Sequence, residues 1–285
     1  AVATGASAAG AELAAVSGEG VGAGSALAAD KLTLVSGASV TMTAAQNNSF
    51  DSTVTAAGTE TITLSDASAA SGSAEVERYV LAAGAQSFTL GASGQNVTLD
   101  STGSSGSVAI STGTLTSVTG TLDDGTGNDT IALTLATTGV DISSANTTDV
   151  DSIALASGVS ATMTIAQHAL ITSAAGTNTV TLSNAGTVSG NAAVEGYVLA
   201  AAGNSAFTLG ATGQNITTGS AGSDTIVVGT LAATGTFNTV SGDTVSLDTG
   251  ADISAVNGEG AGAGSALDAD KLTLVSGASV TMTAA

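Results

Sequence analysis

The sequence predicts an all-β protein, a parallel β-solenoid (β-helix or β-roll) built from duplicated halves of about 120 residues within a 240-residue super-repeat. Three observations predict this fold. A long segment recurs at a fixed offset, short apolar–polar alternations recur at near-regular spacing, and the apolar residues are too small and dispersed to fill a thick core. A solenoid accommodates all three, because stacked coils continue through a repeat and enclose only a narrow interior.

The clearest repeat is the phrase KLTLVSGASVTMTAA, which occupies Lys31–Ala45 and returns unchanged at Lys271–Ala285. A looser echo aligns Lys31–Gln46 with Ser152–Gln167. We therefore expect one period, with overlap, of a longer repetitive protein. The offsets divide the chain into the end of a preceding repeat (1–30), half A (31–151), half B (152–270) and the start of the next repeat (271–285).

Composition leaves two broad alternatives, a folded β protein and a disordered chain. The protein has 38 Gly, four Phe, two Tyr and no Cys, Pro or Trp, and such low aromatic content with high net charge favours disorder. Recurring β-branched residues in alternation with polar ones favour strands instead. A single sandwich or barrel is disfavoured, because it must close and cannot continue through the repeat without a linker.

The formal net charge of −20, with only three Lys and Arg residues, excludes several partners. Nucleic-acid binding and basic membrane-surface helices both need cationic residues that this chain does not supply. No apolar run approaches the ~20 residues of a transmembrane helix. Abundant carboxylates point to divalent cations as counterions, and the lack of Cys agrees with a secreted bacterial protein.

Two short phrases mark the expected strands. In the first, an acidic residue precedes apolar–x–Leu and small residues, and we expect that residue to cap a turn or meet a cation between coils. In the second, an acidic residue or Asn precedes Thr and two alternating aliphatic residues. The first phrase follows Asp30, Glu77, Asp151, Glu195 and Asp270, and the second follows Glu60, Asp129, Asn178, Asp224 and Asp243.

These patterns predict sixteen strand centres, many of them about ten residues apart. Helices are poorly supported because Gly, Ser and Thr interrupt every apolar stripe; only Ala6–Val16 could be helical, and its counterpart GADISAV favours a strand or turn equally. The expected centres are Leu34, Val40, Ile62, Leu81, Phe88, Val97, Val108, Ile131, Ile153, Met163, Val180, Leu199, Phe207, Ile216, Ile226 and Val245.

The most specific local motif is DGTGNDTIA at Asp124–Ala132. It resembles the glycine-rich nonapeptide of repeats-in-toxin proteins, as do GSAGSDTIV around Asp224 and, more distantly, NTVSGDTVS around Asp243. The resemblance implies Ca²⁺ bound by turn carbonyls and Asp carboxylates of stacked turns, and a plain Gly–Asp turn is the alternative. The expected Ca²⁺ residues are Asp124, Gly125, Gly127, Asp129, Asp224 and Asp243.

The Ala-, Thr-, Gly- and Ser-rich composition also resembles the repetitive regions of type I-secreted bacterial adhesins and of surface-layer proteins. That resemblance implies a bacterial extracellular or cell-surface location, Ca²⁺ dependence and no catalysis. We expect a structural repeat segment of a fibre or surface layer, giving a stiff acidic rod that associates with itself or with neighbouring repeats. The alternative is a Ca²⁺-dependent adhesin that binds surface glycan or ice through a Thr- and Asp-bearing face.

Three further features have competing interpretations. His168, the single His, is expected to be a satisfied surface or edge residue rather than a ligand, and its counterpart in half A is Asn47. The pairs Asp123/Asp124 and Asp149/Asp151 could flank a sugar in an enzyme, but the scarcity of cations disfavours catalysis. Thr-x-Thr pairs could bind ice or simply reflect β-propensity; they occur at Thr41/Thr43, Thr61/Thr63, Thr162/Thr164 and Thr179/Thr181.

Overall fold

The protein consists of two compact units, Ala1–Ala154 (unit 1) and Leu155–Ala285 (unit 2). Each unit is a parallel β-solenoid, which confirms the predicted fold class: the strand pairings described within both units are all parallel. The computed structural model describes residues 2–3, 11–12, 32–50, 54–56, 58–82, 84, 86–100, 106–126, 129–258 and 271–275.

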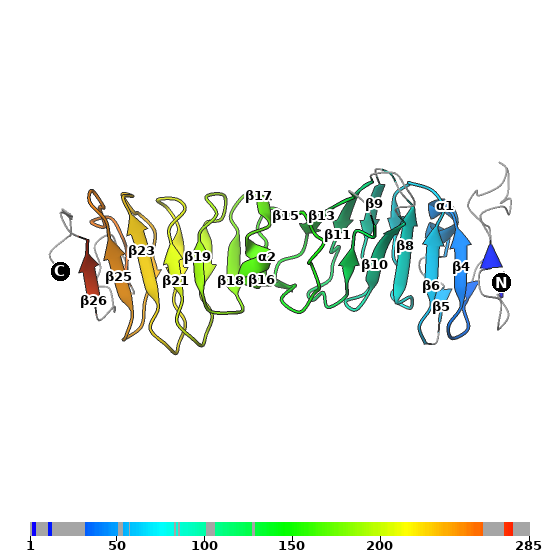
Figure 1. Cartoon of the computed structure of the whole chain (residues 1–285), viewed down its shortest axis with the longest axis horizontal. Coiled ribbons are helices and arrows are strands. Elements are labelled where there is room, and N and C mark those ends of the chain that lie inside the picture. The colour runs from blue at the N-terminus through cyan, green and yellow to red at the C-terminus, as the bar shows by residue number, and fades with distance from the viewer. Residues whose placement is uncertain are drawn as a thin grey trace. The chain divides into compact units, whose positions relative to one another are not determined.

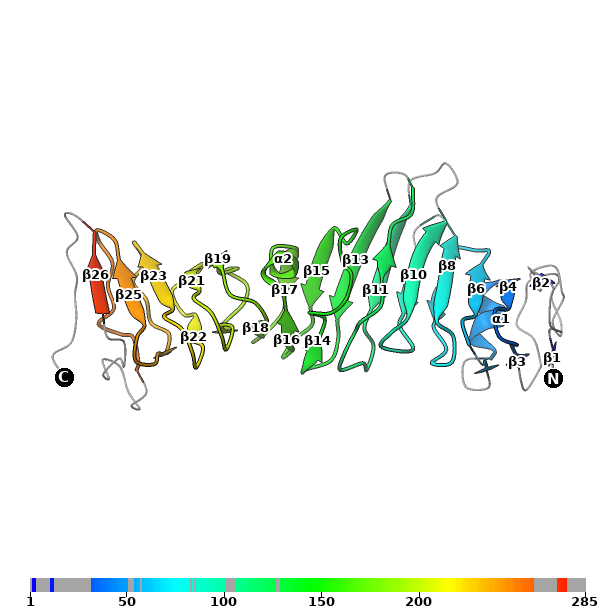
Figure 2. The ribbon, with the colours of Figure 1, turned by 60° about the horizontal axis from the view of Figure 1, so that its bottom comes forward.

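Unit 1 arranges strands β1 to β13 in three parallel sheets, with orders β1-β3-β5, β12-β10-β8-β6-β4-β2 and β13-β11-β9-β7. Figures 1 and 2 show β6, β8 and β10 side by side and pointing the same way. Its strands are β1 (Val2–Ala3), β2 (Ala11–Glu12), β3 (Leu32–Thr33), β4 (Ser39–Met42), β5 (Val54–Thr55), β6 (Thr61–Leu64), β7 (Ala70–Ser71), β8 (Arg78–Ala82), β9 (Gln86–Thr89), β10 (Asn96–Asp100), β11 (Ser107–Ser111), β12 (Leu122–Asp123), β13 (Thr130–Leu135) and β14 (Val140–Asp141).

Unit 2 has two main parallel sheets, with orders β16-β18-β20-β22-β24 and β19-β21-β23-β25-β26. The strand β15 (Ser152–Leu155) runs across the division between the units. The strands of unit 2 are β16 (Ser160–Met163), β17 (Ile171–Ala174), β18 (Thr179–Leu182), β19 (Thr187–Ser189), β20 (Gly196–Val198), β21 (Ala206–Thr208), β22 (Asn215–Thr217), β23 (Thr225–Gly229), β24 (Phe237–Asn238), β25 (Thr244–Leu247) and β26 (Lys271–Leu274).

The core of each unit is a set of inward columns, in which residues of successive coils lie directly beside one another. Side chains alternate between the two faces of a strand, so every second residue joins a column. The register places aliphatic and aromatic residues in these columns, and successive members lie 17 to 25 residues apart in the sequence, as from Ile62 to Tyr79 and from Val97 to Leu122. Each such coil contributes one strand to each of two main sheets. This explains the ten-residue spacing of the sequence. One column in unit 1 is Val40, Ile62, Tyr79, Val97 and Leu122, and one in unit 2 is Ala161, Val180, Tyr197, Ile216 and Phe237.

The expected strand centres agree closely with the structure. All of them fall within a strand except Leu34 and Leu199, which follow β3 and β20 by one residue. The strands that the sequence did not indicate are mainly pieces of two or three residues, such as β12 and β14. The duplication of 120 and 240 residues stays a prediction from the sequence. The possible helix at Ala6–Val16 lies mostly outside the described residues, although β2 falls within it.

Two short helices were missed, α1 (Ala44–Asn48) and α2 (Ile165–His168). Each begins with a capping box. The side chain of Thr43 or Thr164 accepts the backbone N–H of the Gln three residues later, and the side chain of that Gln accepts the backbone N–H of the Thr. The sequence signal Thr-x-x-Gln was present in both places, but the helices are too short to show an apolar stripe. Thr43 and Thr164 are therefore helix caps, so they do not belong to the regular array of exposed Thr residues that ice binding would require.

Candidate metal site

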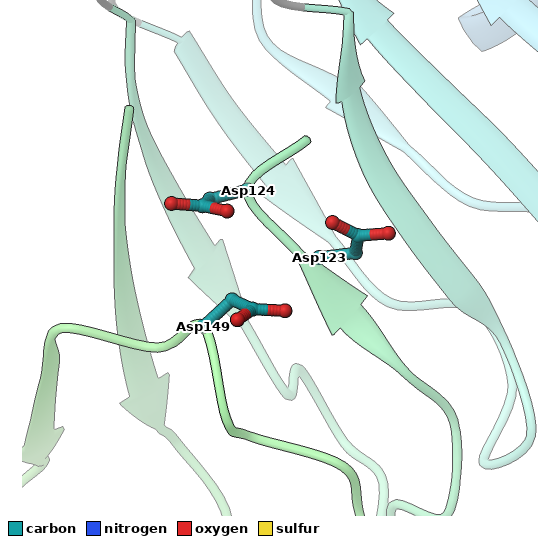
Figure 3. Close-up of side chains that lie close together, drawn as sticks. All are labelled: Asp123, Asp124 and Asp149. Atoms are coloured by element: carbon teal, nitrogen blue, oxygen red, sulfur yellow. The ribbon is translucent and has the colours of Figure 1, made fainter. Parts of the chain in front are cut away.

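Three carboxylates of unit 1 gather at the end of β12. Asp123 ends that strand, Asp124 follows it, and Asp149 comes from the next coil, where the parallel bridge between Thr121 and Asn146 sets the alignment. One oxygen from each carboxylate lies within 4.8 Å of the other two, and all three residues are half-buried (Figure 3). Because Ca²⁺–oxygen distances are about 2.4 Å, these oxygens are close enough to bind one ion.

The electrostatics of this group favour a cation. Partial burial, together with the negative charges of Asp149, Asp151, Asp123 and Asp129, raises the pKa of the Asp124 carboxyl above its ordinary value. A raised pKa means that the ionised form of Asp124 is disfavoured in the folded protein. A divalent cation would remove that penalty, since it neutralises the repulsion between the carboxylates.

The structure brings only part of the expected Ca²⁺ motif to this place. Gly125 has a left-handed backbone, with φ of 77°, and donates its N–H to Oδ1 of Asp123 over 2.8 Å. Gly127 lies outside the described residues. Asp129 is buried, and its Oδ1 accepts the N–H of Gly106 from the preceding coil. Of the residues that the sequence predicts as Ca²⁺ ligands, Asp124 lies in the acidic group, and its partners there are Asp123 and Asp149.

Asp224 and Asp243 hold successive coils of unit 2 together. The carboxylate of Asp224 accepts the N–H of Ser205 at 2.7 Å and that of Gly219 at 2.8 Å. Asp243 in turn accepts the N–H of Asp224 at 2.9 Å and the hydroxyl of Thr218 at 2.6 Å. Both side chains are 1% exposed. Among the described residues, neither belongs to an acidic group that could hold a metal, so the expected role of these two in Ca²⁺ binding has no geometric support.

The acidic residues before the first strand phrase accept backbone N–H groups of the neighbouring coil, where the sequence predicts a turn cap or a cation contact. Glu77 accepts the N–H of Glu60 at 3.0 Å, Asp151 that of Ile131 at 2.8 Å, and Glu195 that of Asn178 at 2.8 Å. Each carboxylate reaches back to the neighbouring coil. Asp30 and Asp270 lie outside the described residues. Buried N–H groups need such acceptors, so these positions stabilise the stacking of coils.

His168 is buried rather than at the surface, which corrects the expectation from the sequence. It is 5% exposed, and its Nε2 lies 3.0 Å from the hydroxyl of Tyr197, which accepts the N–H of Asn191 at 2.7 Å. In unit 1 the hydroxyl of Tyr79 accepts a backbone N–H in the same way and donates to Oδ1 of Asn47 at 3.3 Å. His168 and Asn47 thus have the same structural role.

We expect the stability of the protein to decrease at mildly acidic pH because of His168. Burial lowers the pKa of this imidazole in the folded state, so the unfolded chain binds a proton first. Its stabilising contribution is complete above the unfolded pKa of about 6.5 and is lost as the pH falls below it. Thermal melting between neutral pH and pH of about 5 should show this loss, and His168→Asn, which copies Asn47, should reduce it. Equal pH dependence in both proteins would contradict this role.

No helix in the described part of the chain has the length and apolar character that a membrane crossing requires. Comparison with protein-family models, with curated proteins and with solved structures finds no match to this chain.

Proposed function

We propose that the chain is a structural repeat segment of a long extracellular bacterial protein, a fibre or surface-layer protein like those that its composition resembles. The observation that carries the proposal is the stacking of coils in parallel register, since each coil offers the next the same ladder of hydrogen bonds and inward apolar positions. Such a fold transmits load along its stacking direction and grows by adding coils. The role needs no catalytic residues.

The interior supports this mechanical role through buried polar links between coils. The side chain of Gln214 accepts the N–H of Gly210 at 2.7 Å and donates to the carbonyls of Asn191 at 2.8 Å and Val194 at 2.9 Å. Gln95 makes the matching set in unit 1, with Gly91, Ser73 and Val76. These bonds fix the register of neighbouring coils, because a slip would leave buried polar groups unpaired.

We further propose that Ca²⁺ binds at Asp123, Asp124 and Asp149 and stabilises unit 1. At about ten times its dissociation constant, Ca²⁺ should stabilise the fold by about 1.4 kcal/mol. Thermal melting at low ionic strength should show this gain in the native protein, whereas Asp124→Asn should lose most of it. Without Ca²⁺ the same variant should melt higher than the native protein, because the substitution relieves repulsion between carboxylates.

The matched control for the calcium experiment is Asp100→Asn, which removes an exposed carboxylate of unit 1 outside the group. It should keep the response to Ca²⁺. A native protein whose melting temperature is the same with millimolar Ca²⁺ and with a chelator would contradict the calcium proposal and leave the solenoid unaffected.

The structural role is tested on the cells that produce the protein. Antibodies raised against the purified chain should label intact cells in a continuous layer or along filaments, and external protease should remove the label. Labelling that requires permeabilised cells would contradict an extracellular role.

If the chain is instead an adhesin, a shallow groove favours a glycan as its ligand. It has a volume of about 360 Å³ on the sheet that contains β6, β8, β10 and β12, and Thr61, Arg78, Asn96, Thr98 and Asp123 line it. Short hydroxyl and amide side chains with one cation and one carboxylate can hydrogen-bond a saccharide. Binding of the intact chain to a glycan array, with loss of binding in Arg78→Ala, would favour this alternative.

A further inference from the structure

The strand β19, in the interior of unit 2, has one edge without a neighbouring strand. It is the first strand of its sheet, and among the described strands it pairs with β21 alone. The N–H of Gly190 donates to the carbonyl of Thr208 at 2.8 Å, so the peptide groups of Gly190 and Val188 are directed toward β21. Successive residues of a strand direct their peptide groups to opposite edges. The C=O of Thr187 and both the N–H and the C=O of Ser189 therefore face away from β21, and among the described residues they have no hydrogen-bond partner.

In unit 1 the side chains of α1 occupy the equivalent edge of β7. Nδ2 of Asn48 donates to the carbonyl of Ala69 at 3.0 Å, and Oδ1 of Asn48 accepts the N–H of Ser71 at 3.1 Å. Nδ2 of Asn47 donates to the carbonyl of Ser71 at 2.7 Å. The Asn48 carboxamide thus makes the two bonds that the N–H and C=O of a residue in a parallel strand would make.

Unit 2 has a pocket in place of these contacts. Two residues after the capping Gln of α2 stands Ala169, where α1 has Asn48, and His168 is engaged with Tyr197. Residues of α2, β17 and β19 line a pocket of about 390 Å³. Thr187 and Ser189 lie at this pocket and are exposed, so a ligand can reach their backbone. The apolar part of the lining consists of Ile165, Ala169, Ile171 and Val188.

We infer that this edge binds an extended peptide, which adds to β19 as a parallel strand. The open groups of the edge are, in order, an acceptor on Thr187 and a donor and an acceptor on Ser189. A peptide residue supplies an N–H and a C=O for the first two, and the N–H two residues later supplies the third. Asn47 and Asn48 make the same three bonds within unit 1. The inference is independent of the proposed structural role.

The register defines the side chain that such a peptide needs. The residue that bonds to both Thr187 and Ser189 lies beside Val188, whose side chain is 5% exposed and points inward. Residues paired across a parallel ladder place their side chains on the same face. The side chain of that peptide residue therefore enters the apolar part of the pocket and should be aliphatic. The formal charge of −20 favours basic residues on either side of it.

Nuclear magnetic resonance titration of the isotope-labelled full chain tests the inference. The probe is the synthetic peptide acetyl-Lys-Thr-Val-Thr-Lys-amide. It should shift the amide signals of Thr187, Val188 and Ser189 in a saturable way. Methylation of the backbone nitrogen of its central Val removes the N–H that Thr187 would accept, so the methylated peptide should bind at least about tenfold more weakly.

The protein variant that tests the same contact is Ala169→Asn, which restores the carboxamide present in unit 1. Its side chain should occupy the edge, so the affinity for the peptide should fall at least about tenfold while far-UV circular dichroism stays unchanged. The control is Ala166→Asn, which makes the same substitution at an exposed position of α2 outside the pocket lining. This control should bind the peptide like the native chain.

Three results would overturn the inference. The first is a native chain whose signals at Thr187–Ser189 do not respond to the peptide. The second is undiminished binding by Ala169→Asn. The third is equal binding of the methylated and unmethylated peptides together with the same signal shifts from propionamide, which would make the pocket a site for small carboxamides instead of a peptide strand.

Discussion

Replacing Gln214 with Ala is expected to lower the free energy of unfolding by about 3 kcal/mol. The Gln214 side chain is 1% exposed and makes four hydrogen bonds to backbone groups, the fourth with the N–H of Ala211 at 3.2 Å. Alanine leaves these groups buried without partners and creates a cavity as well. Urea denaturation followed by far-UV circular dichroism measures the loss.

The neighbouring residue supplies the control for this substitution. Asn215 is exposed, and its Oδ1 accepts one bond, from the N–H of Thr236 at 2.9 Å. Asn215→Ala should therefore cost about 1 kcal/mol or less. Equal losses for the two variants would show that the inward glutamine does not hold the coils in register.

Replacing Gly235 with Ala is expected to destabilise unit 2 by about 2–3 kcal/mol. A Cβ at this position would run into the carbonyl oxygen of Gln214 in the coil beside it, and a backbone atom cannot move away as a flexible side chain can. The glycine is required by the close approach of two neighbouring coils and not by its backbone conformation, since its φ lies outside the left-handed region. Thermal or urea unfolding of the variant measures the cost.

Gly213→Ala is the matched control, with an expected effect of opposite sign. A Cβ there would have Thr234 Oγ1, at 3.9 Å, as its nearest neighbour, and its φ also lies outside the left-handed region. Because alanine reduces the entropy of the unfolded chain, this variant should be unchanged or up to about 1 kcal/mol more stable. Destabilisation of both variants to the same extent would contradict the close stacking of coils at Gly235.

The strands were predictable because the alternation of apolar and polar residues that marks a strand is contained in a short stretch of sequence. Ile62, Val180 and Ile226 each stand in a short alternating phrase, and each is fully buried in a strand. The two helices were not predicted, since four or five residues carry no periodicity and only the capping Thr and Gln identify them. Two-residue strands such as β12 depend on the neighbouring coil for their hydrogen bonds, and that neighbour is invisible in the local sequence.

The acidic group was predictable only in part. The sequence identified Asp124 in a turn-like motif and paired Asp123 with Asp124 and Asp149 with Asp151. Whether these pairs meet depends on the length of the coil between them, which aligns Thr121 with Asn146. The motif also placed Asp129, Asp224 and Asp243 at metal-binding positions, but in the fold these side chains turn inward and accept backbone N–H groups. A buried N–H of the preceding coil competes with a cation for the same carboxylate.

The most direct test of the parallel, in-register stacking is thiol cross-linking, which is clean because the chain has no native Cys. Thr162 and Thr181 are register partners on β16 and β18, so their Cα atoms should lie about 4.8 Å apart. Thr179 lies two residues before Thr181 on β18, so its Cα atom should be about 8 Å from that of Thr162 by the same geometry. Oxidation should join the Thr162→Cys/Thr181→Cys pair much faster than the Thr162→Cys/Thr179→Cys pair. Equal rates, or the reverse order, would contradict the register on which the proposed structural role depends.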